Sequence, residues 1–125
     1  MLLRTLRPRL EAGRYVFVCA EDGASTEAAA AWVREDEGVT LVLHQEDADR
    51  RGLAYDLVTA RITLRVHSAL DAVGLTAAVS GALATEGIAC NVVAGYHHDH
   101  LFVPADRAQH ALRLLQRLSA QQPQR

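Results

Sequence analysis

Residues 62–104 read ITLRVHSALDAVGLTAAVSGALATEGIACNVVAGYHHDHLFVP, and this stretch decides the fold. From 62 to 67, apolar and polar residues alternate as in a strand with one buried face. A helix with one apolar stripe follows and ends at Glu86-Gly87; the stripe consists of Leu75, Ala78, Val79, Ala82 and Leu83. Residues 88–95 are apolar or small on both faces, which predicts a strand covered on both sides. Residues 97–100 are predicted to form a turn, and residues 101–104 a short strand.

The remaining chain contains further elements of both kinds. A last helix is predicted from the stripe Ala108, Ala111, Leu112, Leu115 and Leu118, and residues 120–125 form a polar tail. In the first half, residues 15–19 and 39–43 are strands, and 46–51 is a short helix that Gly52 ends. Residues 26–32 suit a short helix, but residues 32–43 suit a hairpin better. The strand and helix of 39–53 share an outline with residues 100–112, which suggests an internal repeat.

Composition excludes several classes of function. The 125 residues are half hydrophobic, which is enough for a real core, and the net charge of -2 gives no basic face for nucleic acid or an anionic membrane. All 13 basic residues are arginine, so lysine chemistry and a phosphate-loop lysine are excluded. The N-terminal residues do not resemble a secretory signal, and no apolar run is long enough to span a membrane. We therefore expect a cytoplasmic protein without nucleic-acid or membrane partners.

Several stretches together resemble a known family. Residues 66–75 look like the loop of ACT domains, in which an aspartate precedes a glycine at a helix start, and LATEGIACNV (83–92) resembles the helix end and second strand. With REDEGVTLVL (34–43), residues 73–104 resemble the short bacterial tandem-ACT proteins. The resemblance implies an α+β, ferredoxin-like βαββα sheet with helices on one face, with a partial ACT-like unit over 1–59 and a complete one over 60–119. The chain departs from the better-known amino-acid regulators at Ala72-Val73, where a proline commonly precedes the glycine.

The resemblance also implies a function, which is regulatory and non-catalytic binding of a small molecule such as an amino acid, with no cofactor. The loop offers a physical reason: Asp71 can cap the helix, and the backbone N–H groups of Val73, Gly74 and Leu75 lie at its positive end, open to a carboxylate. Asn91, Tyr96 and Asp99 follow the neighbouring strand and can orient a ligand. The candidate ligand-binding residues are Ser68, Asp71, Val73, Gly74, Leu75, Thr76, Asn91, Tyr96 and Asp99. The alternative is that Gly74 only permits close packing of helix on sheet and Asp71 is only a cap.

A strand covered on both sides needs a second cover besides the helix layer, which predicts a homodimer or a seam between two subdomains, with the ligand near that seam. The alternative function is a metal-binding or protein-interaction module using the turn at 97–100. Because side chains alternate along an extended chain, only His98 and His100 face the same way there, with His67 as a third candidate ligand.

Cys19 and Cys90 lie in apolar runs and are expected to be buried, with a disulfide between them disfavoured. Catalysis by Cys90 or Ser68 with a histidine is not expected, since a buried thiol is usually inert.

Overall fold

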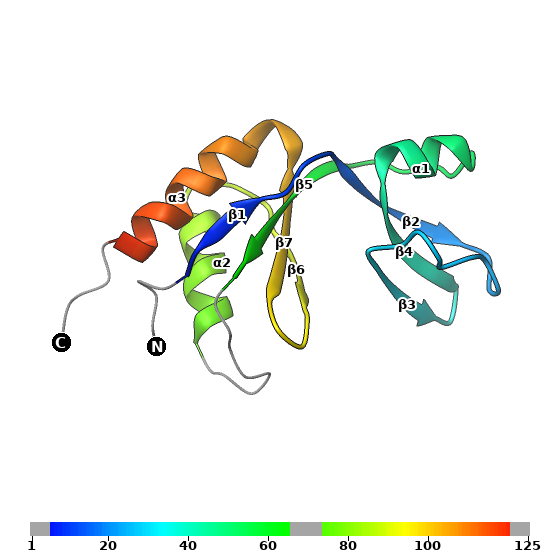
Figure 1. Cartoon of the computed structure of the whole chain (residues 1–125), viewed down its shortest axis with the longest axis horizontal. Helices are drawn as coiled ribbons and strands as arrows, with labels where there is room; N and C mark the ends of the chain where they lie inside the picture. Colours follow the sequence, from blue (N-terminus) through cyan, green and yellow to red (C-terminus); the bar gives the residue numbers. More distant parts are fainter. Residues whose placement is uncertain (1–5, 66–73, 121–125) are drawn as a thin grey trace. The chain divides into compact units, whose positions relative to one another are not determined.

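The computed structural model of the chain describes residues 6–65 and 74–120 (Figure 1). The chain divides into two compact units: residues 13–59, here called the inserted unit, and residues 1–12 with 60–125, here called the main unit. The sequence predicted a first unit over 1–59, whereas in the structure residues 6–12 belong to the same compact unit as the second half of the chain. Strand β5 (Val58–Leu64) gives its first two residues to the inserted unit and the rest to the main unit.

The main unit is a sheet with two helices. Its strands lie in the order β1 (Pro8–Leu10), β5, β7 (Asp99–Pro104) and β6 (Asn91–Ala94). Strand β1 is antiparallel to β5, and β6 is antiparallel to β7. Helix α2 (Leu75–Thr85) connects β5 to β6, and the 3₁₀ turn η2 (Ala105–Arg107) leads from β7 into helix α3 (Ala108–Ala120). This order confirms the predicted α+β, ferredoxin-like fold, and β1 supplies its fourth strand.

The core of the main unit lies between the sheet and both helices. Ile62 and Leu64 of β5 and Leu101 and Val103 of β7 are buried in one cluster with residues of the two helices. The helix residues of this cluster all belong to the predicted stripes: Leu75, Val79, Leu83, Ala108, Ala111 and Leu115. Leu112 and Leu118 of the second stripe are partly buried against it. Because strand side chains alternate, Arg61, Thr63 and His100 lie on the other face of the sheet. This second face carries the polar groups described below.

Helix α2 begins and ends at glycine. Its N-cap is Gly74, whose φ of 94° is a left-handed conformation that glycine adopts without strain. At the other end Glu86 is the C-cap, and Gly87 follows with a φ of 70°. The predicted helix and its glycine stop are confirmed.

The strands of the inserted unit follow one another in the sheet in the same spatial order as the strands of the main unit. It contains β2 (Tyr15–Ala20), β3 (Ala31–Glu35), β4 (Gly38–His44) and the six-residue helix α1 (Gln45–Arg50), in the sheet order β3-β4-β2 followed by the start of β5. The main unit has the matching order β6-β7-β5-β1. Residues 31–44 form the predicted hairpin, and no helix occupies residues 21–30. Helix α1 follows β4 as α3 follows β7, which confirms the internal repeat.

Three local predictions were wrong. Residues 88–95 do not form a strand covered on both sides, because only residues 91–94 form a strand, β6, and its Asn91 and Ala94 are exposed on opposite faces. Cys19 is exposed rather than buried, since it faces away from the residues of β2 that pack in the core, and both cysteines are free. Thr63 is buried although it alternates with the core residues of β5, because its hydroxyl is hydrogen-bonded on the second face.

Candidate functional site

The start of α2 presents backbone N–H groups that its own residues do not cap. The N-cap residue, Gly74, has no side chain, and among the described residues neither a capping hydrogen bond nor an acidic residue of the first turn neutralises this end. The Gly74 carbonyl accepts the first helical hydrogen bond from the Ala78 N–H at 2.9 Å. The N–H groups of Leu75, Thr76 and Ala77 therefore have no acceptor within the helix and lie at its positive end. An anionic group such as a carboxylate matches this arrangement.

Some predicted ligand residues lie outside the described residues: Ser68, Asp71 and Val73, as well as His67 from the metal alternative. The capping role of Asp71 therefore stays a prediction. Of the described residues at the helix start, Leu75 is buried in the core and Thr76 is exposed. Leu75 thus anchors the helix by its side chain, and its contribution to a ligand is restricted to its backbone.

Of the other predicted ligand residues, Tyr96 and Asp99 lie in or beside the β6–β7 turn, whereas Asn91 is the first residue of β6, at the end of the strand away from the turn. Figure 1 shows this turn and the start of α2 at the same end of the main unit. Asn91 is exposed on the edge strand, Tyr96 is exposed with its ring edge-on to His97 at 5.1 Å, and Asp99 is half-buried opposite Ala94. Among the described residues, no hydrogen bond or ion pair joins Asn91, Tyr96 or Asp99 to Gly74, Leu75 or Thr76. The β6–β7 turn and the start of α2 thus share one end of the unit.

The histidines are divided between the turn and strand β7. The Gly95 N–H donates to the His98 carbonyl at 2.9 Å, and a Cβ at Gly95 would lie 2.7 Å from that oxygen. The turn therefore spans residues 95–98, and His100 belongs to β7 rather than to the turn. The Nδ1 atom of His98 is buried without a hydrogen-bond partner among the described residues.

His100 belongs to a polar network on the second face of the main sheet. Its Nδ1 lies 3.1 Å from Arg61 Nη2 and 3.2 Å from Thr63 Oγ1, and the Thr63 hydroxyl donates to Glu11 Oε2 at 2.7 Å. Arg9 Nη2 donates to the same Glu11 oxygen at 3.0 Å. Since a guanidinium can only donate, His100 Nδ1 accepts from Arg61, and the neutral ring carries its proton on Nε2.

The network lowers the pKa of two of its members. Burial lowers the pKa of His100, and the charges of Arg61 and His98 lower it further against the opposing effect of Asp99 and Glu11. Burial alone would raise the pKa of Glu11, but the hydrogen bonds from Thr63 and Arg9, with the charges of Arg9 and Arg61, give a net lowering. Both shifts favour a neutral histidine beside an ionised glutamate.

The His100 shift predicts that the protein loses stability on acidification. The unfolded chain binds a proton near the ordinary value of 6.5, whereas folded His100 resists it, so this contribution is present above that pH and is lost as the pH falls. In His100→Asn, the amide oxygen can accept from Arg61 without titrating. We expect its melting temperature to fall less than that of the wild type between about pH 6.5 and 5.5. If the melting temperatures of the two proteins fell by the same amount over this range, the effect could not be assigned to His100. Glu11 does not titrate in this range, because its pKa lies below the ordinary value of 4.5.

The described residues give the metal alternative no support. Among residues 6–65 and 74–120, no group of three histidine, cysteine or acidic side chains could hold a metal ion. In addition, the Arg61 guanidinium places a positive charge at His100 Nδ1, and the ring proton on Nε2 would have to leave before that atom could bind a metal. His67, the third candidate, lies outside the described part of the chain.

Cys90 does not have the environment of a catalytic nucleophile. Burial raises the pKa of the Cys90 thiol, which opposes formation of the thiolate. Cys90 is half-buried and packs against the core of the main unit. Such a thiol behaves as a small apolar side chain.

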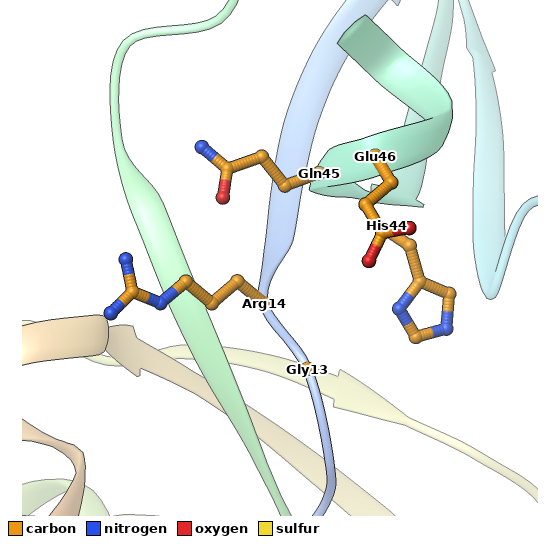
Figure 2. A pocket seen from close by; sticks show the side chains of 5 residues that line it. All are labelled: Gly13, Arg14, His44, Gln45 and Glu46. Atoms are coloured by element: carbon orange, nitrogen blue, oxygen red, sulfur yellow. The ribbon is translucent and has the colours of Figure 1, made fainter. Parts of the chain in front are cut away.

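A shallow pocket of about 190 Å³ lies in the inserted unit, at the start of α1. It is lined by Gly13, Arg14, His44, Gln45 and Glu46. Figure 2 shows the Arg14 and Gln45 side chains extending away from those of His44 and Glu46, so the polar groups do not converge on one point. The backbone carbonyl of Arg14 is already used, since it accepts from the Gln45 N–H at 2.9 Å.

Sequence reasoning missed both the pocket and the polar network. The alternation of residues 62–67 placed Thr63 on the face opposite Ile62 and Leu64, and extending it back by one residue would have added Arg61 to that face. The remaining partners, Glu11 and His100, come from distant parts of the chain and carry no local signal.

No helix among the described residues is long and apolar enough to cross a membrane.

Comparison with known proteins identifies both halves of the chain. Two family models described as ACT domain match residues 1–60 and 59–117. A Vibrio cholerae protein of unknown function, described as a possible transport protein, is 47% identical with a TM-score of 0.84, covering 94% of this chain and 93% of its own. An Agrobacterium tumefaciens protein is 21% identical with a TM-score of 0.71, covering 90% of this chain and 87% of its own.

A third similar structure is the ligand-free regulatory subunit of aspartate kinase from Thermus thermophilus. It is 9% identical with a TM-score of 0.65 and covers 89% of this chain and 95% of its own, which is a likeness of fold alone. No protein with a curated description matches the sequence. With two ACT models in tandem and a relative of nearly equal length at 47% identity, the chain belongs to the ACT domain family.

Proposed function

We propose that this protein is a non-catalytic regulator that binds a small molecule with a carboxylate, in the first place an amino acid, at the start of α2. The single observation that carries the proposal is the helix start at Gly74, where the N-cap residue has no side chain and the first turn contains no acidic residue. Membership of the ACT family supports the regulatory part. The likeness in fold to a regulatory subunit of aspartate kinase agrees with it.

The residues around the helix start suit an amino acid. Leu75 fixes the helix in the core, so the N–H groups have a rigid support. The β6–β7 turn, which contains Tyr96 and leads into Asp99, lies at the same end of the unit as this helix start (Figure 1). There a carboxylate such as that of Asp99 can meet an ammonium group, and a tyrosine ring can cover an apolar side chain. The ligand then acts by favouring one conformation of the protein over another.

A thermal-shift panel of the common amino acids tests the proposal. Since a ligand binds the folded state only, at a hundred times its dissociation constant it adds about 2.7 kcal/mol of stability. We expect one amino acid, or a few of related structure, to raise the melting temperature in a saturable way. No shift with any amino acid would contradict the proposal, and a shift with zinc or nickel alone would favour the histidine turn instead.

Two glycines of the same helix provide a matched pair of variants. Gly74→Val is expected to weaken binding of the stabilising amino acid by tenfold or more, a loss of about 1.4 kcal/mol, because a branched side chain would cover the N–H groups. Gly87→Val imposes a similar backbone cost at the other end of α2, since both glycines have positive φ. Each variant is expected to lose about 1–2 kcal/mol of stability, but only Gly74→Val should lose binding. Equal affinities of the two variants in calorimetric titrations would place the site elsewhere.

A further inference from the structure

The charges of the chain are divided unevenly between its two units. The inserted unit contains ten acidic residues and four arginines, whereas the main unit contains five acidic residues and nine arginines. The net charge of -2 for the whole chain therefore conceals a basic main unit and an acidic inserted unit. A local excess of one sign of charge attracts a partner of the opposite sign and repels others.

Three exposed arginines lie together on β1 and β5, which are paired strands of the main unit (Figure 1). Arg9 is opposite Thr63, and Arg65 follows Thr63 by two residues, so both arginines lie on the second face of the sheet. Arg7 is beside Arg65, because the Arg7 carbonyl accepts from the backbone N–H and from the side-chain Nε–H of Arg65, each at 3.3 Å. Arg7, Arg9 and Arg65 are here called the arginine patch.

One carboxylate is paired with the arginine patch among the described residues, that of Glu11. Its Oε2 atom lies 3.0 Å from Arg9 Nη2, and the Arg9 side chain remains 53% exposed. Arg7 and Arg65 form no ion pair within the part of the chain that the structure describes. Because a guanidinium has five N–H donors, the patch has many donors left for an incoming carboxylate.

The arginine patch carries costs that the fold does not require. Arg7 has a φ of 49° and is the only residue besides glycine with a positive φ in residues 6–65 and 74–120. Arg65 places a second positive charge beside it, and like charges on neighbouring strands destabilise a sheet. Both side chains are exposed, so no burial of apolar surface offsets these costs. Backbone strain of this kind is concentrated at binding sites, which points to a function for the patch.

We propose that the arginine patch is the docking site for a short acidic segment of a partner protein. Guanidinium groups bind carboxylates through two parallel hydrogen bonds, which a lysine cannot make. From residue 7 to residue 11 the backbone is about 13 Å long, which an extended segment of about four or five residues covers. Acidic residues at alternate positions of such a segment all face the patch.

The charges favour a short peptide over a nucleic acid. A nucleic acid would extend well beyond a patch about 13 Å long, and the rest of the chain, with its excess of acidic residues, repels the remaining phosphates. A short segment meets the patch alone. The proposal does not depend on the ligand site, because α2 packs on the opposite face of the sheet.

Fluorescence anisotropy with a labelled peptide of about six glutamates tests the docking site with two matched double variants. Arg9→Gln with Arg65→Gln is expected to weaken binding by about fivefold or more. Arg113→Gln with Arg117→Gln removes the same charge from exposed positions of α3 in the same unit, and should bind within about twofold of the wild type because salt screens distant charges. Equal losses in the two double variants, or no saturable binding by the wild type, would overturn the proposal. Tighter binding of single-stranded DNA of the same charge would also overturn it, in favour of a nucleic acid.

Arg7→Asn tests whether the strained arginine serves binding rather than folding. Asparagine adopts a left-handed conformation more readily and removes the charge beside Arg65, so this variant is expected to melt at a higher temperature than the wild type. It should also bind the glutamate peptide more weakly. Arg113→Asn is the control, since it places a poorer helix former in α3 and should melt slightly lower with unchanged affinity. A lower melting temperature for Arg7→Asn, or unchanged affinity, would overturn the proposal.

Discussion

Replacing Gly38 by alanine is expected to lower the free energy of unfolding by on the order of 4 kcal/mol, from backbone strain and overpacking together. Gly38 begins β4 with a φ of 141°, a conformation that residues with a side chain rarely adopt. A Cβ atom there would lie 2.4 Å from the backbone carbonyl oxygen of Ala20. That oxygen belongs to β2, the neighbouring strand, and cannot move without disturbing the pairing of Ala20 with Val39.

Gly23→Ala separates the two causes of this loss. Gly23 has a φ of 90°, but nothing lies within 4 Å of the position of its Cβ. We expect a loss of about 1–2 kcal/mol, from backbone strain alone. Urea denaturation of both variants measures the difference. Equal losses would show that the close approach of Gly38 to Ala20 does not constrain the protein.

Replacing Leu83 by alanine is expected to cost about 2–5 kcal/mol, because it leaves a cavity in the core of the main unit. Leu83 is fully buried and lies on the stripe of α2 that faces β5 and β7. Leu57→Ala is the control, since that side chain is 45% exposed and its loss should change stability by less than about 0.5 kcal/mol. Urea denaturation again measures both, and a similar small loss for the two would contradict the packing of α2 on the sheet.

The parts of the fold that could be predicted from sequence are those with a local periodic signal. The stripe of α2 and the hairpin of β3 and β4 follow from patterns within a few residues. The pairing of β1 with β5 joins residues more than fifty positions apart, and three residues carry no usable period. Residues 88–95 were expected to be covered on both sides because they are apolar or small on both faces, but composition alone does not reveal that Asn91 and Ala94 of β6 are exposed.

The candidate site divides in the same way. Gly74 was predicted as the helix start from the glycine and the stripe after it, and α2 begins at Leu75. The network of Glu11, Thr63 and His100 could not be predicted, since it depends on β5 lying between β1 and β7. The adjacent histidines suggested metal binding by their spacing, but His100 lies in a strand where it accepts a hydrogen bond from Arg61.

The most direct test of the proposed function is a calorimetric titration of the wild type with the most stabilising amino acid and with its carboxamide. If a carboxylate occupies the N–H groups at the start of α2, the amino acid should give a saturable binding heat. The carboxamide, which lacks the charge, should bind at least about tenfold more weakly, since a hydrogen bond to a charged group is worth about 1.5–3 kcal/mol. Equal affinity for the two compounds, or no saturable heat with any amino acid, would contradict the proposal.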